Sequence, residues 1–192
     1  MSATRPIATT RSATGIPTGK LAVWWVVGSE IVIFGGLLAA YIMHRLGHPE
    51  WAEYASHTNP WFGGINTFVL LTSSLFAVLA HYSAEQGDGK KAARWLVGTA
   101  AGGFIFICIK AVEWSIEISH GYTITANGFW GFYYTAAGIH ALHVIAGCII
   151  MLIIANDARK GKELHRVELI GIYWHFVDIV WIFLFPLLYI AK

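Results

Sequence analysis

Charged residues are scarce in this sequence. Only 12% of its 192 residues are Asp, Glu, Lys or Arg, whereas about a quarter are charged in an ordinary soluble domain. Hydrophobic residues make up 56% of the chain and aromatic residues 15%. A soluble chain of this length could not bury that much apolar surface. The composition therefore excludes a soluble globular protein, and it also excludes a disordered chain.

Cysteine and net charge are scarce as well. The two cysteines, Cys108 and Cys148, both lie within apolar runs, so neither a disulfide framework nor a thiolate metal site is indicated. The net charge is only +2, and no stripe of basic and aromatic residues is present that could follow nucleic-acid phosphates. Nucleic-acid binding is therefore excluded, and the class that is left is an integral membrane protein.

Five apolar stretches are long enough to cross a membrane as helices, which takes about 20 residues. They are Leu21–Met43, Trp61–His81, Trp95–Ile118, Phe129–Ala155 and Leu169–Ala191. None has the alternating pattern of a transmembrane barrel strand. The sequence therefore predicts an all-α fold, an integral membrane bundle of five transmembrane helices over residues 21–192. The preceding residues 1–20 are rich in Thr, Ser, Ala and Gly, and we expect them to form a disordered cytoplasmic tail.

Basic residues gather on one side of the predicted bundle. Ten lie in the tail and in the second and fourth loops: Arg5, Arg11, Lys20, Lys90, Lys91, Arg94, Arg159, Lys160, Lys162 and Arg166. The opposite side has only Arg45 and Lys192. Because cytoplasmic loops carry an excess of Lys and Arg, this pattern predicts a cytoplasmic N-terminus and a C-terminus outside the cell.

Ionisable residues occur inside the spans, where a charge near the bilayer centre costs about 2.5–3.5 kcal/mol. At 1.5 Å per residue, Glu30, His140, His143 and Asp178 lie within about 5 Å of the centre. His140 and His143 share a helix face, as do His175 and Asp178. We therefore expect a buried polar cluster of Glu30, His140, His143, His175 and Asp178. Within it we expect Glu30 to pair with His143 as first choice and with His140 next, and Asp178 to pair with His175 or with the backbone.

A second polar face lies on the third span, toward the outer leaflet. Lys110, Glu113 and Glu117 are spaced so that they share one side of the helix. We expect Lys110 and Glu113 to form a local ion pair or to contact another subunit.

Three interpretations of these groups stay open. They can be hydrogen-bonded pairs that hold helices together, a proton-handling or regulatory cluster, or a metal site built from histidines and carboxylates. The Glu-x-x-His spacing of di-metal bundles is absent. No nucleophile with a base, phosphate-binding glycine loop or haem-ligand pattern stands out. The residues alone therefore assign no catalytic, cofactor-binding or metal-ligating position.

Five motifs of the sequence together resemble a known family. The segment Tyr173–Phe185 (YWHFVDIVWIFLF) resembles the last helix of subunit III of the heme-copper oxidases. Thr135–Gly147 (TAAGIHALHVIAG) resembles its penultimate motif, with paired histidines. The other three are Gly28-Ser29-Glu30, Asn66-Thr67 and Lys110–Trp114 (KAVEW). The resemblance covers nearly everything after the tail, so the sequence is similar to this family along almost its whole length.

The resemblance implies a respiratory complex in the bacterial cytoplasmic membrane. In that family subunit I carries the haems and copper, and subunit III supports subunit I, sustains proton uptake and holds lipid in a cleft. We therefore expect subunit I as the main partner, phospholipid as a bound ligand, and no redox centre in this chain. Compared with the seven-helix form of the family, the first two helices, which help to wall that cleft, are missing.

Other assignments stay open within and beyond this family. It also includes quinol oxidase subunits and accessory proteins of nitric oxide reductases, and Trp181–Tyr189 is similar to the short bacterial forms, some of which accompany those reductases. Other subunits bind the electron donor, so both cytochrome c and quinol are compatible with this sequence. Beside the oxidase subunit and the nitric oxide reductase protein, a third hypothesis lies outside this family: an independent membrane metalloenzyme.

Overall fold

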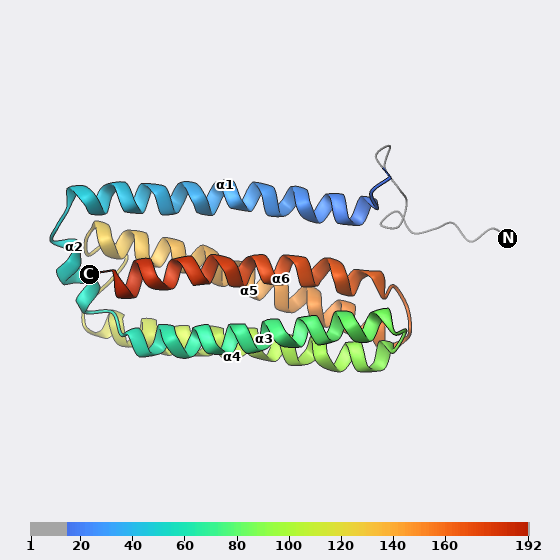
Figure 1. The fold of residues 1–192 in the computed structure, drawn as a ribbon. Coiled ribbons are helices and arrows are strands. Elements are labelled where there is room, and N and C mark those ends of the chain that lie inside the picture. Colours follow the sequence, from blue (N-terminus) through green and yellow to red (C-terminus); the bar gives the residue numbers. More distant parts are fainter. Residues whose placement is uncertain (1–14, 192) are drawn as a thin grey trace.

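The computed structural model describes residues 15–191 and is helical throughout (Figure 1). Its elements are α1 (Thr18–Gly47), α2 (Trp51–Ser56), α3 (Pro60–Glu85), α4 (Gly89–Ser119), α5 (Gly128–Arg159), α6 (His165–Phe185) and a π-helical turn, η2 (Pro186–Ile190). Five of these helices are long and apolar enough to cross a membrane, the last one running from His165 through Ile190. The predicted all-α bundle of five spans is therefore confirmed.

The helices begin where the sequence supplies capping side chains. Asn59 accepts a hydrogen bond from the Trp61 amide at the start of α3, and Pro60 follows it in the first turn. Asp88 accepts from the Lys91 amide at the start of α4, and Asn127 from the Trp130 amide at the start of α5. Each cap satisfies an amide that has no partner within its own helix.

The helices extend beyond the apolar stretches that predicted them. For example, α4 begins at Gly89, six residues before the apolar run, and α5 continues to Arg159. Hydropathy falls where charged residues enter the polar region, but backbone hydrogen bonding continues through them. Helix α2 is only six residues long and was not predicted. Of the expected tail, residues 1–14 lie outside the described part of the chain, and α1 already begins at Thr18.

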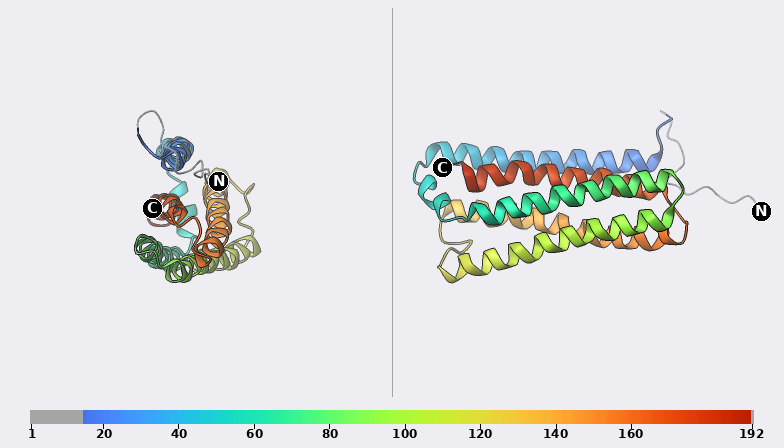
Figure 2. Two further views of the ribbon diagram at one scale, coloured as in Figure 1. Left: turned by 90° about the vertical axis from the view of Figure 1, so that its right-hand side faces the viewer. Right: turned by 60° about the horizontal axis from the view of Figure 1, so that its bottom comes forward.

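Four of the spans form the body of the bundle. Helix α3 packs against α4 and α6, and α5 packs against the same two helices. Helix α1 lies along one side, where it contacts mainly α6 and, less extensively, α5 (Figures 1 and 2). The end view in Figure 2 shows α1 on the opposite side of the assembly from α4. The long helices run side by side with α2 at one end of the bundle (Figure 1).

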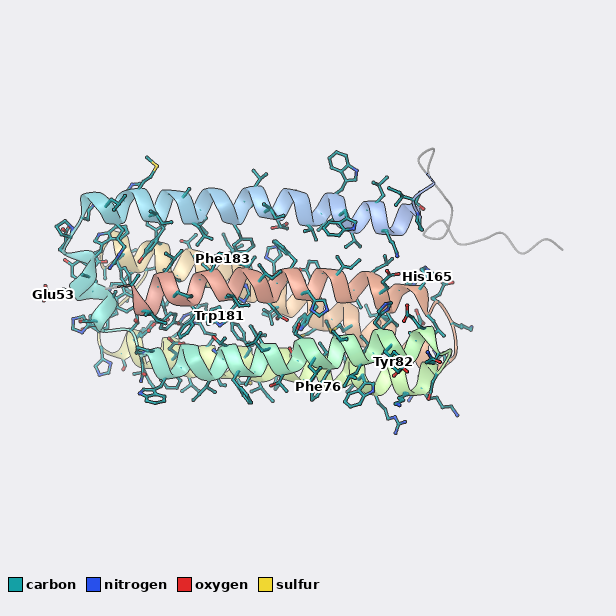
Figure 3. The ribbon with its side chains drawn as sticks, in the orientation of Figure 1. Glu53, Phe76, Tyr82, His165, Trp181 and Phe183 are labelled. Carbon is teal, nitrogen blue, oxygen red and sulfur yellow. The ribbon has the colours of Figure 1, made fainter. Side chains whose placement is uncertain are left out.

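Two buried tryptophans of α6 join it to α3. The indole nitrogen of Trp174 donates to Ser73 Oγ over 3.1 Å, and that of Trp181 donates to Thr67 Oγ1 over 3.0 Å. Figure 3 shows Trp181 between α6 and α3, whereas Phe183 lies on the other side of α6 and is 57% exposed. These bonds satisfy the one polar atom of each ring, so two large aromatic groups can occupy the core.

Small residues let the helices approach one another closely. Gly102 of α4 faces Ser73 of α3, and Gly147 of α5 faces the ring of Trp174. A Cβ at Gly102 would lie 2.6 Å from that of Ser73. Large apolar side chains on the outside of the bundle, such as Phe68, Phe104 and Leu142, are exposed. This arrangement is typical of helices that pack through small residues and present apolar surface to lipid.

Candidate functional site

The first polar contact joins α1 to α5. Glu30 Oε2 lies 3.1 Å from His143 Nε2, and the two side chains are 16% and 21% exposed. This is an ion-pair distance, although the two groups are not aligned as a hydrogen bond. The edge of Phe34 packs against the His143 ring, with centroids 5.4 Å apart. The expected contact between Glu30 and His143 is therefore present, and an aromatic side chain covers it.

The contact of the other ring nitrogen, Nδ1, shows which nitrogen of His143 carries a hydrogen. His143 Nδ1 lies 2.8 Å from the carbonyl oxygen of Ile139. Because a carbonyl oxygen only accepts, Nδ1 carries a hydrogen, and Nε2 is the nitrogen that faces Glu30. An ionised carboxylate and the lone pair of a neutral Nε2 would repel each other, so an attractive contact needs one further proton, on the carboxyl group or on Nε2. In either form the contact joins α1 to α5.

The predicted pairing of Asp178 with His175 or with the backbone is wrong. His175 Nδ1 lies 2.6 Å from Ser74 Oγ of α3. Both carboxyl oxygens of Asp178 are buried and make no hydrogen bond within residues 15–191, although the Ser74 hydroxyl lies within interaction range of the carboxyl group. Ser74 therefore lies near both residues, and its short contact is with His175.

His140 is enclosed by aromatic rings. It is fully buried and lies between Phe106 and Trp181, with ring centroids at 5.4 and 5.3 Å. Neither ring nitrogen of His140 has a hydrogen-bond partner in the described part of the chain, and the same holds for the side-chain amide of Asn66. Of the five residues predicted as one cluster, only Glu30 and His143 are therefore in direct polar contact within residues 15–191. His175 and Asp178 both lie near Ser74 but not against each other, and His140 is enclosed by aromatic rings.

The second polar face is a buried network around Lys110. Lys110 is 1% exposed, and its Nζ lies 2.9 Å from Glu113 Oε2, 3.1 Å from the Tyr133 hydroxyl and 2.6 Å from the Tyr189 hydroxyl. The predicted local ion pair of Lys110 and Glu113 is therefore present. It is completed by phenols from two other helical segments, α5 and η2.

Donors and acceptors in this network balance. The ammonium group of Lys110 has three hydrogens and three partners. Tyr189 accepts one of these hydrogens and donates its own to Glu113 Oε1 over 2.7 Å. Tyr133 also accepts from Lys110, and its hydroxyl lies 3.0 Å from a carboxyl oxygen of Glu117. A buried cation is tolerable only with such complete partnering.

Glu117 extends the network toward the loop between α4 and α5. Its Oε2 lies 3.4 Å from the hydroxyl of Tyr134, whose one hydrogen is donated to the carbonyl oxygen of Tyr122 over 2.7 Å. Aromatic rings surround the cation: Lys110 Nζ lies between 5.0 and 5.6 Å from the ring centroids of Tyr133, Tyr189, Trp114 and Trp181. These rings add a favourable electrostatic contact with the cation.

A proline positions the last member of the network. Pro186 has no amide hydrogen, so the α-helical bonding of α6 ends there. The chain continues as the π-helical turn η2, in which the Ala191 amide donates to the Pro186 carbonyl oxygen over 2.8 Å. This turn brings Tyr189 inward, where its side chain is fully buried. The hydroxyl of Tyr41 donates to the carbonyl oxygen of Leu187 over 3.0 Å and attaches α1 to the same turn.

The tyrosines were missed in the sequence because Tyr133, Tyr134 and Tyr189 lie in apolar spans, where aromatic residues are expected to pack or to face lipid. A signal was available in the loop between α4 and α5. Glu117 lies a few residues before this loop and Tyr133 a few residues after it, so helix geometry places them at similar depth.

The fold and these contacts define a class of protein: a multi-pass membrane bundle whose helices are joined by buried polar side chains. Within residues 15–191, no three His, Cys, Asp or Glu side chains are grouped so as to hold a metal ion.

Comparison with known proteins identifies the family. The model of the family described as "Cytochrome c oxidase subunit III" matches residues 9–192. A protein of Thermostichus vulcanus named cytochrome c oxidase subunit 3 is 35% identical over 84% of this chain and 82% of its own length. The protein of that name from Corynebacterium diphtheriae is 32% identical, over 86% and 84%. The one from Bacillus sp. (strain PS3) is 31% identical, over 97% and 93%.

The chain belongs to the cytochrome c oxidase subunit III family. It is a subunit III of a heme-copper oxidase and a multi-pass protein of the bacterial cytoplasmic membrane. The relatives named above are cytochrome c oxidase subunits, so the nitric oxide reductase and quinol oxidase alternatives are not favoured.

Proposed function

We propose that this chain supports the catalytic subunit I of the oxidase and carries no redox centre of its own, with the haems and copper held by partner subunits. A protein of Aeropyrum pernix named "Heme-copper oxidase subunit I+III" supports the partnership. It is 30% identical to this chain over 90% of the chain, which corresponds to 22% of its own length. Joining the two subunits in one polypeptide fixes a one-to-one ratio and keeps them adjacent, as expected of direct partners.

The buried contacts suit a supporting role. The Lys110 network joins α4, α5 and η2, and the Glu30–His143 contact joins α1 to α5. Without a hydrophobic driving force between helices in lipid, such polar contacts and close packing hold a membrane bundle together. A bundle joined in this way presents a stable surface to its partner. We propose that the Glu30–His143 contact is primarily structural and that the loop containing Lys90 faces the cytoplasm.

Affinity purification tests the proposal. The chain, tagged and expressed in its own host, is extracted in mild detergent, and the co-purifying chains are identified together with the haem spectrum and the metal content. We expect a subunit I in the purified complex, with haem and copper. The chain purified alone serves as the control and should have neither haem absorbance nor bound metal.

Two results would overturn the proposal. One is stoichiometric haem, copper, iron or zinc in the isolated chain. The other is that the tagged chain, extracted from its own host in mild detergent, co-purifies with no subunit I. A purified complex whose catalytic subunit lacks copper would instead place the chain with a nitric oxide reductase.

A further inference from the structure

An apolar groove lies between α4 and α5 on the outside of the bundle. It encloses about 550 Å³ and is lined by aliphatic, aromatic and small side chains from both helices, with Phe104 and Leu152 on its walls and Ala100 at its base. Its α4 side extends from Val97 to Ile107. Ten residues of helix rise about 15 Å, which is about half the thickness of the hydrocarbon core. The groove therefore matches the depth of one leaflet.

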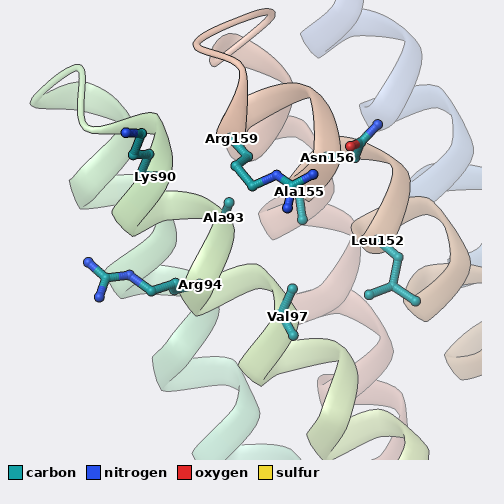
Figure 4. Close-up of a pocket in the computed structure, with 8 residues that line it drawn as sticks. All are labelled: Lys90, Ala93, Arg94, Val97, Leu152, Ala155, Asn156 and Arg159. Atoms are coloured by element: carbon teal, nitrogen blue, oxygen red, sulfur yellow. The ribbon is translucent and has the colours of Figure 1, made fainter.

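The groove opens into a second hollow at one end of the bundle. The two share Val97 and Leu152, so they are continuous. The second hollow encloses about 390 Å³, and three basic residues line it, Lys90, Arg94 and Arg159. Figure 4 shows Arg159 extending over Ala155, with Lys90 and Arg94 on the facing helix. An apolar channel thus ends in a hollow lined by three basic residues.

These three charges are not neutralised by other side chains in the described part of the chain. None of them forms an ion pair with any residue from 15 to 191, and all three are exposed. The nearby acidic residues have other partners. Asp88 caps α4, and Asp157 contacts Arg166.

The charged groups of these three side chains point in directions that are consistent with the absence of a counter-charge between them. In Figure 4 the head groups of Lys90 and Arg94 point away from Arg159, as like charges do when nothing negative lies between them. Their long, exposed side chains can turn toward an anion that enters the hollow.

The groove is separate from the polar contact with α1. Leu152 follows His143 by nine residues on α5, and at 3.6 residues per turn it points to the opposite side of that helix. His143 faces Glu30 of α1, so the groove faces away from α1. It is a surface of α4 and α5 only.

We infer that this groove is a binding site for one anionic phospholipid, with an acyl chain between α4 and α5 and the phosphate among Lys90, Arg94 and Arg159. The chemistry of the two ends carries the assignment. Basic pockets between transmembrane helices on the cytoplasmic side bind anionic head groups, and guanidinium groups bind phosphate oxygens in a bidentate manner. The apolar part has the volume of a ligand site and has no charged residue along its walls.

The test uses the whole oxidase complex, purified in mild detergent and analysed by native mass spectrometry with added phosphatidylglycerol. Arg94→Gln/Arg159→Gln removes two charges from the hollow. Lys160→Gln/Lys162→Gln removes two from the loop that follows α5 and is the matched control. Each basic residue near an anionic lipid contributes about 1 kcal/mol, or about fivefold in affinity, so the first variant, which lacks two of them, should bind the lipid about 30-fold more weakly. The control should bind it as the native complex does.

A second pair of variants tests the apolar part. Ala101→Phe fills the groove, in which Ala101 is an exposed lining residue, and Ala146→Phe adds the same bulk to an exposed site of α5 outside it. Only Ala101→Phe should lower binding, while both complexes stay assembled.

Three outcomes would overturn the inference. Lipid binding could be unchanged in both groove variants, or it could fall equally in the matched controls. Alternatively, a photoreactive probe at position 101 could cross-link to a partner subunit and not to lipid in the intact complex. That last outcome would assign the groove to a helix of the partner.

Discussion

The ammonium group of Lys110 lies 2.6 Å from the hydroxyl of Tyr189, which is 79 residues later in the chain. The contact joins the middle of α4 to the π-helical turn after α6. Because Tyr189 also donates to Glu113 over 2.7 Å, a single phenol bridges the cation and its counter-ion. The position of the last helical turn is therefore linked to the charge balance of the core.

Removing that phenol should weaken the bundle. In Tyr189→Phe, Lys110 loses one of its three hydrogen-bond acceptors in a buried site, which costs about 1.5–3 kcal/mol for a charged group. The measurement is denaturant-induced unfolding of the purified complex in detergent. Tyr82→Phe is the control, because Tyr82 is 58% exposed and lies outside the Lys110 network. Equal stability of the two variants would contradict the assigned role of Tyr189.

Removing one charge of the network should destabilise the complex more than removing both. Lys110→Met leaves Glu113 buried without its cation, a change that costs about 3–5 kcal/mol. Lys110→Met/Glu113→Gln removes both charges and should recover much of that loss. The yield of assembled complex and its unfolding midpoint are the measurements, with the exposed Lys91→Met as control. A double variant less stable than Lys110→Met would show that the two residues are not energetically paired.

The sequence predicted the spans and the shared face of Lys110, Glu113 and Glu117 because both depend on local periodicity. Twenty apolar residues must form a helix in lipid, where every backbone group needs an internal partner. Spacings of three and four then place side chains on one face. The contact of Glu30 with His143 was also predictable, because two polar groups at the same depth of the bilayer have few other polar partners within reach.

The partners of Asp178 and His175 were not predictable in this way. Their spacing allows a contact within α6, but Ser74 of α3 lies against that face and contacts His175 instead. Finding it needs the register of α3 against α6, which Trp174 and Trp181 set through their bonds to Ser73 and Thr67. Register is a property of packing between helices, and hydropathy does not contain it.

Two glycine substitutions should have opposite effects. Gly102→Ala places a methyl group against Ser73, where α3 and α4 are in close contact, and overpacking of this kind costs about 1–3 kcal/mol. Gly64→Ala meets nothing within 4 Å, so the gain in helix propensity, about 0.5–1 kcal/mol, should dominate. Unfolding of the two purified complexes gives the comparison. A stabilising Gly102→Ala would show that α3 and α4 can separate without cost.

The orientation of the chain can be tested by labelling. In a background without Cys108 and Cys148, a cysteine at Lys90 should react with a membrane-impermeant maleimide only after the cells are opened. A cysteine at Glu53, at the other end of the bundle (Figure 3), should react in intact cells. The basic loops predict this result through the positive-inside rule. The reverse labelling pattern would invert the proposed topology.

Substitution of Glu30 separates a structural role from a proton-handling one. Glu30 lies 3.1 Å from His143 and is mostly buried, so losing its polar group leaves the histidine without that partner, at a cost of about 1–3 kcal/mol. Glu30→Gln keeps an amide that can still bind His143, and we expect it to assemble normally, with proton pumping close to that of the native complex. Glu30→Leu should loosen the packing of α1 against α5 and reduce assembly. The measurements are the yield of intact complex and the proton-to-electron ratio in reconstituted vesicles. If Glu30→Gln assembles normally but pumps poorly, the carboxyl group handles protons and the structural assignment is wrong.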